Sequence, residues 1–302
     1  MSISRQNLTV VIVSFMSDNV IHDCIKSIPE DIKIIVIDNS NNKLFKDRIE
    51  KQYDNITCLL SSENLGMGSG NNLGLKEVST EFAFILNPDT ILKKNTIDEI
   101  IKASNNLPSF SIIAPILDDD KFPNYKLSEK KETPPNYIDP YKVKSVDGFA
   151  MILNLKRINS LNTFENYQYF DENFFLYLEN DDLCKRINEN NENIYIVPKA
   201  KIKHLGAGAV DKKYAYEIEL TRNWHWLWSK FYFNKKHYGF FKSLIKSLPT
   251  FFSAISKYIF YSPFDKKKKE IYLYRALGFL NAVLGKKSYL RPKIKISDQE
   301  NR

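Results

Sequence analysis

The segment 82–90 reads FAFILNPDT, a short apolar run that ends abruptly in polar residues. The apolar run predicts a buried strand. Pro88 has no backbone N–H and cannot continue a central ladder, so the strand must end there and Asp89 follows its carboxyl end. In open α/β sheets, ligands and metals bind at that edge. An alternative is that Asp89 or Thr90 caps a helix expected over 96–103.

Strand and helix patterns alternate ahead of this segment. Apolar β-branched runs predict strands at 8–15, 32–37 and 56–60, and amphipathic spacing predicts helices at 18–27 and 44–53. This β-α-β-α-β order predicts an α/β fold with a Rossmann-like, mostly parallel sheet of the nucleotide-binding type. The second strand also ends in an acid, Asp38, so two carboxylates are expected at the same edge of the sheet.

A glycine-rich segment, ENLGMGSGNNLGL, occupies 63–75 and holds four of the ten glycines in the chain. Glycine lets backbone N–H groups approach an anion, and a helix expected over about 71–78 would add its positive end. The pattern matches neither GxGxxG nor GxxxxGK[ST], the two phosphate-loop motifs. A phosphate-binding loop and a flexible turn are therefore both open.

Further strands are predicted at 111–116, 146–155 and 194–197, and a long polar surface loop at 118–141. The strand at 146–155 begins with Asp147 and Gly148. His204 comes just before a glycine-rich turn. In a chain that already offers an Asp at a strand end, this histidine is a candidate metal ligand.

A second dense segment, FDENFFLYLENDDLCKR, runs over 170–186. Three carboxylates, Glu179, Asp181 and Asp182, lie within four residues where helical spacing begins. Acids at a helix start favour the helix dipole, which is the structural interpretation. Acids this close also repel one another unless they serve a base, a metal or a substrate, and one of them in a cleft would be a good general base.

The charge is unevenly distributed along the chain. Residues 230–302 carry a net charge of +13 and the preceding residues −5, which favours an anionic surface as partner of the tail. Helices are predicted at 216–236, 243–261 and 270–284. The second of these has an apolar, aromatic stripe beside lysines and a kink at Pro249, which is typical of a helix lying on a membrane. Packing against the body, or a homodimer, explains the stripe equally well.

Three scattered cysteines and the absence of a leader-like start at 1–7 favour a reducing compartment. No uncharged apolar stretch is long enough to span a bilayer. We therefore expect a cytoplasmic protein, peripheral on the inner face of the cell membrane. We expect two regions, a nucleotide-sugar-binding catalytic domain at 1–228 and a basic, aromatic helical extension at 229–302.

The motifs LTVVIVSF, VIDNS, ENLGMGSGNNLGL, ILNPDT, VDGFAMIL, FLYLENDDLCKR, IKHLGAG and RNWHW occur in the order seen in family 2 glycosyltransferases of the GT-A fold. Over roughly residues 8–235, the chain resembles this family, in particular bacterial rhamnosyltransferase-like enzymes. The resemblance implies an inverting transfer of a sugar, such as rhamnose, from a dTDP- or UDP-linked donor. The acceptor would be a cell-surface polysaccharide or a lipid-linked glycan.

The resemblance also implies roles for individual residues. Those placed at the nucleotide-sugar donor are Ser14, Phe15, Asp38, Asn64, Gly66, Asn71, Asn87 and Arg222. Asp89 matches the acid of a DXD-like motif and, with His204, would bind Mg²⁺ or Mn²⁺ at the diphosphate. Asp147 and Gly148 match a binding motif near the acceptor.

The family's acidic motif usually reads Glu-Asp-x-Asp, whereas this chain has Asn180 at the second position. If the residue at that position is the family's catalytic base, Asn180 cannot replace it, because an amide cannot take a proton. We rank Asp181 first as the catalytic base, with Asp182 and Glu179 as alternatives and an impaired enzyme as a further one.

Two other function classes remain in view. A sugar nucleotidyltransferase would carry glycine and basic residues directly after the first strand, where this chain reads SFMSDNV. A non-catalytic nucleotide-sugar- or membrane-binding module is kept open by Asn180. Nucleic-acid binding is disfavoured, because no reader motif is present and the body is acidic.

Overall fold

The structure, a computed structural model, describes residues 2–119, 123–127, 138–161, 164, 168–206, 210 and 212–294. The chain forms two compact units. The first contains Met1–Leu65, Ser69–Asp171 and Asn180–Val210, and the second contains Gly66–Gly68, Glu172–Glu179 and Asp211–Arg302. The boundary expected at 228 falls inside a single helix, α7 (Ala215–Tyr238).

The first unit is built on a nine-stranded mixed sheet. Its strand order is β3-β2-β1-β4-β10-β6-β11-β5, and β8 pairs with β11. The parallel half contains β1 (Leu8–Ser14), β2 (Lys33–Asp38), β3 (Ile56–Leu60) and β4 (Phe82–Leu86). The other half contains β5 (Thr90–Leu92), β6 (Ile112–Leu117), β8 (Tyr141–Lys142), β10 (Ala150–Asn154) and β11 (Ile194–His204). A small second sheet pairs β7 (Tyr125–Lys126) with β9 (Ser145–Val146).

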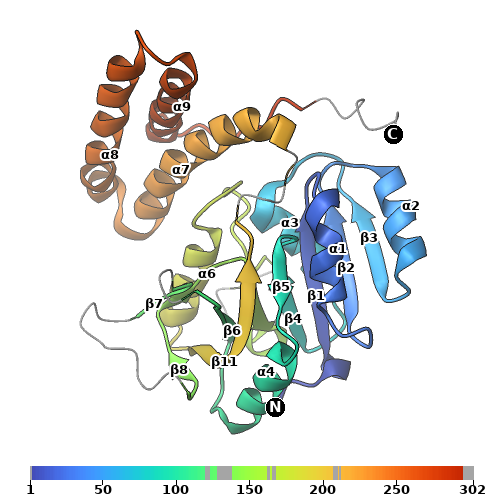
Figure 1. Cartoon of the computed structure of the whole chain (residues 1–302). Helices are drawn as coiled ribbons and strands as arrows, with labels where there is room; N and C mark the ends of the chain where they lie inside the picture. Colours follow the sequence, from blue (N-terminus) through green and yellow to red (C-terminus); the bar gives the residue numbers. More distant parts are fainter. Residues whose placement is uncertain are drawn as a thin grey trace. The chain divides into compact units, whose positions relative to one another are not determined.

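Helices cover both faces of the large sheet (Figure 1). One face packs against α1 (Asp18–Lys26), α2 (Lys43–Gln52) and α4 (Thr96–Asn106). The other packs against α3 (Gly66–Lys76), α5 (Leu155–Asn159) and α6 (Glu179–Glu189). Strand alternation explains the two cores, because Val10 and Ile12 of β1 belong to the first cluster and Val11 to the second. The predicted α/β architecture is confirmed.

The interpretation of the glycine-rich segment as a flexible turn is wrong from Gly66 onward, where the segment forms α3. Its glycines allow close helix-to-strand packing. A Cβ at Gly70 would lie 2.9 Å from Val13 Cγ1, and a Cβ at Gly74 would crowd Val11 and Ile37. Propensity alone disfavours a helix this rich in glycine, so burial against β1 and β2 stabilises it.

The strand expected at 194–197 is longer than predicted. It runs through Pro198 to His204, with a register shift between Val197 and Lys201 where it pairs with β6. Proline cannot donate to the ladder, so the bulge accommodates it and pairing then resumes. The loop expected at 118–141 lies largely outside the described residues, although its Tyr125–Lys126 part forms β7.

The second unit contains three long helices, α7, α8 (Phe240–Tyr261) and α9 (Lys266–Val283). They enclose a core of Trp224, Leu227, Trp228, Phe231, Phe279 and Ala282. Gly278 allows α9 to approach α7 closely, because a Cβ there would overlap the Trp224 carbonyl oxygen. Pro249 lies within α8, which continues to Tyr261. The structure also describes two short 3-10 helices, Arg5–Asn7 in the first unit and Lys212–Tyr214 in the second.

Candidate active site

Sheet register brings together Asp89 and His204, which are far apart in the sequence. Strand β5 pairs antiparallel with the end of β11, so that His204 lies opposite Thr90. The Leu205 N–H donates to the Asp89 carbonyl at 2.9 Å. As a result, Nε2 of His204 lies 3.3 Å from Oδ1 of Asp89, whose side chain is only 4% exposed.

The Asn87–Thr90 turn is held rigidly beside this pair. Both the N–H and the hydroxyl of Thr90 donate to the Asn87 carbonyl, at 3.2 and 2.7 Å. The Asn87 N–H donates in turn to Phe149, whose ring stacks on His204 with centroids 4.2 Å apart. Asp89 caps no helix, since α4 begins after Asn95 and Thr90 starts β5. The capping interpretation of Asp89 and Thr90 is therefore wrong.

Several oxygens at this edge of the sheet are buried without a hydrogen-bond partner. Within the described part of the chain they include Oγ of Ser14 and Oδ1 of Asn71, Asn87 and Asp89. The His204 ring is near Asp89 Oδ1 but does not hydrogen-bond to it. Each such atom costs about 1–3 kcal/mol, and native proteins bury few of them. Ser14 ends β1, and Asn87 and Asp89 follow β4, so three of these atoms lie at the carboxyl ends of neighbouring strands.

The pair of Asp89 and His204 fits a divalent cation. A carboxylate oxygen with an imidazole nitrogen suits Mn²⁺, while Mg²⁺ prefers oxygen ligands alone. The described residues contain no group of three or more His, Cys, Asp or Glu side chains placed to hold a metal ion. A cation here would therefore complete its coordination with oxygens of a substrate or water.

The predicted nucleotide end of the site is formed by the ends of β1 and β2. Ser14 and Asp38 are neighbours in the parallel register, and both are buried. The Asp38 carboxylate accepts hydrogen bonds from the Ser40 hydroxyl at 2.7 Å and from the Asn42 N–H at 2.8 Å. Burial raises the pKa of Asp38, and these hydrogen bonds lower it in part. Asp38 therefore organises the turn after β2 through Ser40, a residue that the sequence analysis did not single out.

The donor-side residues Phe15 and Asn64 lie in loops, the first directly after β1 and the second just before α3. The Phe15 N–H is bonded to the Ser17 hydroxyl at 3.3 Å. Asn71 is carried on α3, and Gly70 beside it packs close to the Asn39 side chain, because a Cβ added at this glycine would lie 3.4 Å from Asn39 Nδ2. Phe15 and Asn71 therefore border the same strand ends as Ser14 and Asp38.

The acids of α6 have different surroundings. Asp182 is fully buried, and its Oδ2 accepts from Nε of Arg186 at 2.9 Å. Asp181 is 15% exposed, and its Oδ1 lies 2.7 Å from the mostly exposed Nζ of Lys126. Asn180 donates through its amide to the Val146 carbonyl at 2.9 Å. Asp182 therefore has the geometry of a structural ion pair, and Asp181 that of an accessible carboxylate.

Asp147 lies in the same neighbourhood as Asp181. Burial raises the pKa of its carboxyl, Lys126 lowers it, Asp181 raises it and His204 lowers it. Gly148 packs against Asn180, since a Cβ at this glycine would lie 3.1 Å from that of Asn180. The loop before β10 thus lies between the metal-candidate pair and α6. Lys126 was not singled out from the sequence, because nothing in a loop marks which acid its lysine will meet.

Gly66, Glu179 and Arg222 belong to the second unit. Gly66 has φ +80°, and a Cβ there would overlap the Phe175 carbonyl, which accepts from the Met67 N–H at 3.0 Å. Nε of Arg222 donates to the Tyr177 hydroxyl at 2.8 Å. Close packing thus explains why residue 66 is a glycine. One nitrogen of Arg222 is engaged by the Tyr177 hydroxyl.

Tyr177 and Leu178, just before the acids of α6, both have positive φ, at 71° and 68°. Two consecutive non-glycine residues in the left-handed region are strained, and such strain is found mostly at functional sites. No sequence pattern marks this strain, because neither residue type favours that conformation. The strained residues directly precede the first residue of α6, Glu179.

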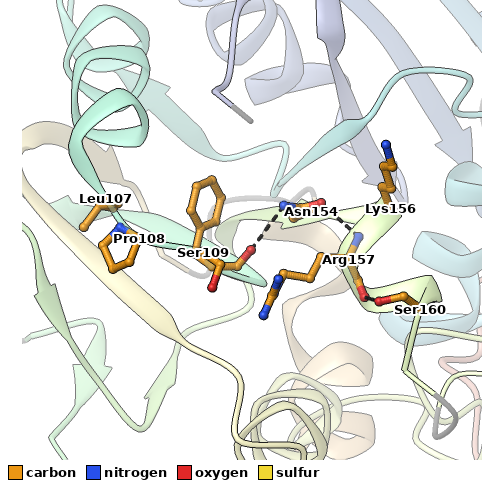
Figure 2. A pocket seen from close by; sticks show the side chains of 8 residues that line it. Leu107, Pro108, Ser109, Asn154, Lys156, Arg157 and Ser160 are labelled. Carbon is orange, nitrogen blue, oxygen red and sulfur yellow. Dashed lines mark hydrogen bonds between the residues drawn. The ribbon is translucent and has the colours of Figure 1, made fainter.

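A pocket of about 350 Å³ lies elsewhere in the first unit, lined by Leu107, Pro108, Ser109, Phe110, Asn154, Lys156, Arg157 and Ser160 (Figure 2). It is at the opposite end of β4 from Asp89, because Asn154 pairs with Phe82. Asn154 bonds to Phe110 and Arg157, and Arg157 forms an ion pair with Glu192. Asn154 and Arg157 are therefore held in place by protein neighbours.

Comparisons with known proteins agree with this architecture. The model of the family described as "Glycosyl transferase family 2" matches residues 9–175. The low-salt glycan biosynthesis hexosyltransferase Agl10 of Haloferax volcanii is 29% identical over 206 residues, which cover 62% of this chain. The match spans 64% of the length of that relative.

Solved structures share the fold at low sequence identity. A mannosyltransferase, PcManGT from Pyrobaculum calidifontis, in complex with GDP-Man and Mn²⁺, is 10% identical with a TM-score of 0.53. That alignment covers 94% of this chain and 89% of the other. A fragment of S. aureus TarS (1-349) is 13% identical with a TM-score of 0.50, covering 94% and 93% of the two chains.

The family model matches more than half of the chain, and its range contains β1, the Asp38 turn and the Asn87–Thr90 turn. The sheet with helices on both faces is the GT-A fold of the solved neighbours. The chain is a member of glycosyl transferase family 2.

Proposed function

We propose that the protein transfers a hexose or deoxyhexose from a nucleoside-diphosphate sugar to a hydroxyl group of a glycan or lipid-linked acceptor, with inversion at the anomeric carbon. The observation that carries the proposal is the pair formed by Asp89 and His204 beside the unpartnered buried oxygens at the carboxyl edge of the sheet. This arrangement offers a cation and a donor the contacts that the free protein leaves unused.

Asp89 and His204 would hold a divalent cation, and Mn²⁺ suits their mixed oxygen and nitrogen donors. When bound, the cation would neutralise negative charge on the departing nucleoside diphosphate. Mn²⁺ and GDP-Man in the mannosyltransferase neighbour support this choice of cation. The hexosyltransferase relative supports the transfer of a hexose. A dTDP- or UDP-linked donor and a rhamnosyl group rest on the resemblance to rhamnosyltransferase-like enzymes alone.

We assign the catalytic base to Asp181. Asp182 is engaged by Arg186 in the interior, so it would have to leave a buried ion pair to accept a proton. Asp181 keeps an exposed edge, and its Oδ1 is paired with the Lys126 ammonium. Asn180 supports the loop at Val146 by donating a hydrogen bond, a task that an ionised Asp could not perform.

In the mechanism we propose, Asp181 removes the proton of the acceptor hydroxyl, and that oxygen attacks the anomeric carbon on the face opposite the diphosphate. Ser14, Asn71 and the turn held by Asp38 bind the nucleotide and fix the donor. Asp147, between His204 and Asp181, orients the acceptor hydroxyl. A single displacement inverts the configuration and needs no covalent enzyme intermediate.

The test is donor hydrolysis with Mn²⁺ across a panel of nucleotide sugars, followed by transfer to glycan acceptors. We expect one donor to be hydrolysed slowly without acceptor, and the Asp89→Asn protein to lose that activity. The matched control is Asp118→Asn, an exposed acid paired with Lys93 in the same unit. Full activity of Asp89→Asn would contradict the assignment.

A non-catalytic donor-binding module is the second candidate, and the amide at Asn180 is the observation that favours it. The two candidates differ in one measurement. A binding module would raise its melting temperature with the right donor and Mn²⁺ yet release no nucleoside diphosphate, whereas the transferase would do both.

A further inference from the structure

Helix α8 carries large apolar side chains that face outward. Phe241, Ile245, Phe252 and Ile259 are separated by four or seven residues, so at 100° per residue they share one side of the helix. All four are exposed, Phe241 by 79%. We call these four residues the α8 outer face. Phe260 beside it and Phe264 after the helix are exposed as well.

The inward side of the same helix packs against the core of the second unit. Ser243, Ser247 and Ala254 are buried, and the Ser243 hydroxyl donates to the Phe231 carbonyl at 2.6 Å. Larger side chains that pack partly buried against the core are Leu244, Leu248 and Phe251. An ordinary surface helix places polar residues on its other side. Helix α8 is apolar on that side too, so its outer face is suited to contact an apolar environment outside the protein.

The charges of α8 itself are all positive. Helix α8 contains Lys242, Lys246 and Lys257 and no acidic residue. Four further lysines, Lys266–Lys269, begin α9. Several of these lysines lie over tyrosine rings, with Nζ of Lys246 4.0 Å from the centroid of the Tyr238 ring. Lysines with apolar stems and tyrosines are the side chains that occupy the headgroup level of a bilayer.

We propose that the α8 outer face docks on the surface of an anionic phospholipid bilayer. The apolar side chains enter the boundary between headgroups and acyl chains, and the flanking lysines meet the lipid phosphates. Among the described helices, none has the length and hydropathy needed to cross a bilayer, so the helix lies along the surface.

The charges argue for lipid over a second copy of the chain. A symmetric contact through α8 would place the lysines of one copy near those of the other, with no acid on either helix to pair with them. Anionic headgroups offer the opposite charge, and an apolar layer lies directly beneath them. The proposal concerns the second unit alone and stands independently of the transferase chemistry.

Vesicle co-sedimentation with the full chain tests the proposal. We expect binding to vesicles of phosphatidylcholine with phosphatidylglycerol, little binding to phosphatidylcholine alone, and weakening as salt rises. A triple variant, Phe241→Ser, Phe252→Ser and Ile259→Ser, should bind at least about tenfold more weakly. The matched control is Leu44→Ser, because Leu44 on α2 and Phe252 are both 59% exposed.

A second variant, with Lys242, Lys246 and Lys257 changed to Gln, should lose the preference for phosphatidylglycerol while keeping its helical circular dichroism. Unchanged vesicle binding by the folded triple variant would overturn the proposal. So would a dimeric protein that the triple variant turns into a monomer, with no binding of either to vesicles.

Discussion

The two units depart from the usual polarity of proteins in opposite directions. In the first, polar oxygens such as Asp89 Oδ1 are buried without hydrogen-bond partners. In the second, large apolar side chains such as Phe241 face outward. Both departures cost stability in the free protein. The difference suggests what each unit can bind: a cation and hydrogen-bond donors in the first, and an apolar surface in the second.

The largest expected effect is at Asp89. Asp89→Asn keeps the shape but removes the charge, so kcat/KM with donor and Mn²⁺ should fall by about a hundredfold or more. The melting temperature of the free protein should stay the same or rise, because the variant no longer buries a charged oxygen without a hydrogen bond. Steady-state kinetics and calorimetry check the two halves. A clear drop in the melting temperature of Asp89→Asn would show that Asp89 stabilises the fold.

The next effect concerns Asp181. Asp181→Asn should lower kcat by about 10²–10⁴-fold, the usual contribution of a general base, with donor affinity nearly unchanged. The comparison variant is Asp182→Asn, which breaks the buried pair with Arg186 and should lower the melting temperature. Single-turnover kinetics and donor titration separate the two. If Asp182→Asn were stable and inactive while Asp181→Asn stayed active, the base assignment would move to Asp182.

His225, a buried polar group of the second unit, is hydrogen-bonded, whereas Asp89 Oδ1 of the first unit is not. His225 is satisfied on both ring nitrogens, by the Leu290 carbonyl at 2.8 Å and the Ser288 hydroxyl at 3.0 Å. Burial lowers its pKa from 6.5 to about 4, so the ring is neutral in the folded protein. Between these values the unfolded chain binds a proton that the folded one does not.

The free energy of unfolding should therefore be highest above pH 6.5 and fall as the pH drops towards about 4. The loss amounts to about 3 kcal/mol, since one pKa unit corresponds to about 1.4 kcal/mol. Urea unfolding followed by tryptophan fluorescence, which reports Trp224 and Trp228 in this core, measures it. His225→Gln should flatten the profile between the two pH values, and an equally steep profile in that variant would place the dependence elsewhere.

The smallest effect is a packing one. Gly278→Ala should destabilise the second unit by about 1–3 kcal/mol, because the added methyl group overlaps the Trp224 carbonyl. The comparison variant is Gly285→Ala in the same unit, where the methyl group meets open space and only the φ of +72° opposes it. Thermal unfolding of both variants separates the clash from the backbone strain. A melting temperature of Gly278→Ala equal to that of the parent protein would mean that α7 and α9 can separate without cost.

Much of the first unit could be predicted from the sequence, because its strands are apolar runs that stop at defined breakers. Strand β4 matches the predicted run at 82–86, and Pro88 ends it as expected. The carboxyl ends of β1 and β2 follow by the same reasoning. The helical character of the C-terminal region was also predictable, from apolar spacing around Trp224 and Trp228.

What could not be predicted depends on partners distant in the sequence. The glycines of α3 read as a loop, since only packing against Val11 and Val13 makes them helical. The extension of β11 past Pro198 depends on its pairing with β5 and β6. The contact between Lys126 and Asp181 joins β7 to α6, across 55 residues of sequence. No local pattern carries that information.

The pairing of β5 with β11 has a consequence for folding. Side chains alternate across a sheet, so a slip of one residue between these strands would turn the His204 ring to the other face, away from Asp89. β5 is the terminal strand of the sheet order, where register is held from one side alone. A cation shared by Asp89 and His204 would select the native strand alignment, because it could bind only chains in which β5 had paired with β11 in register.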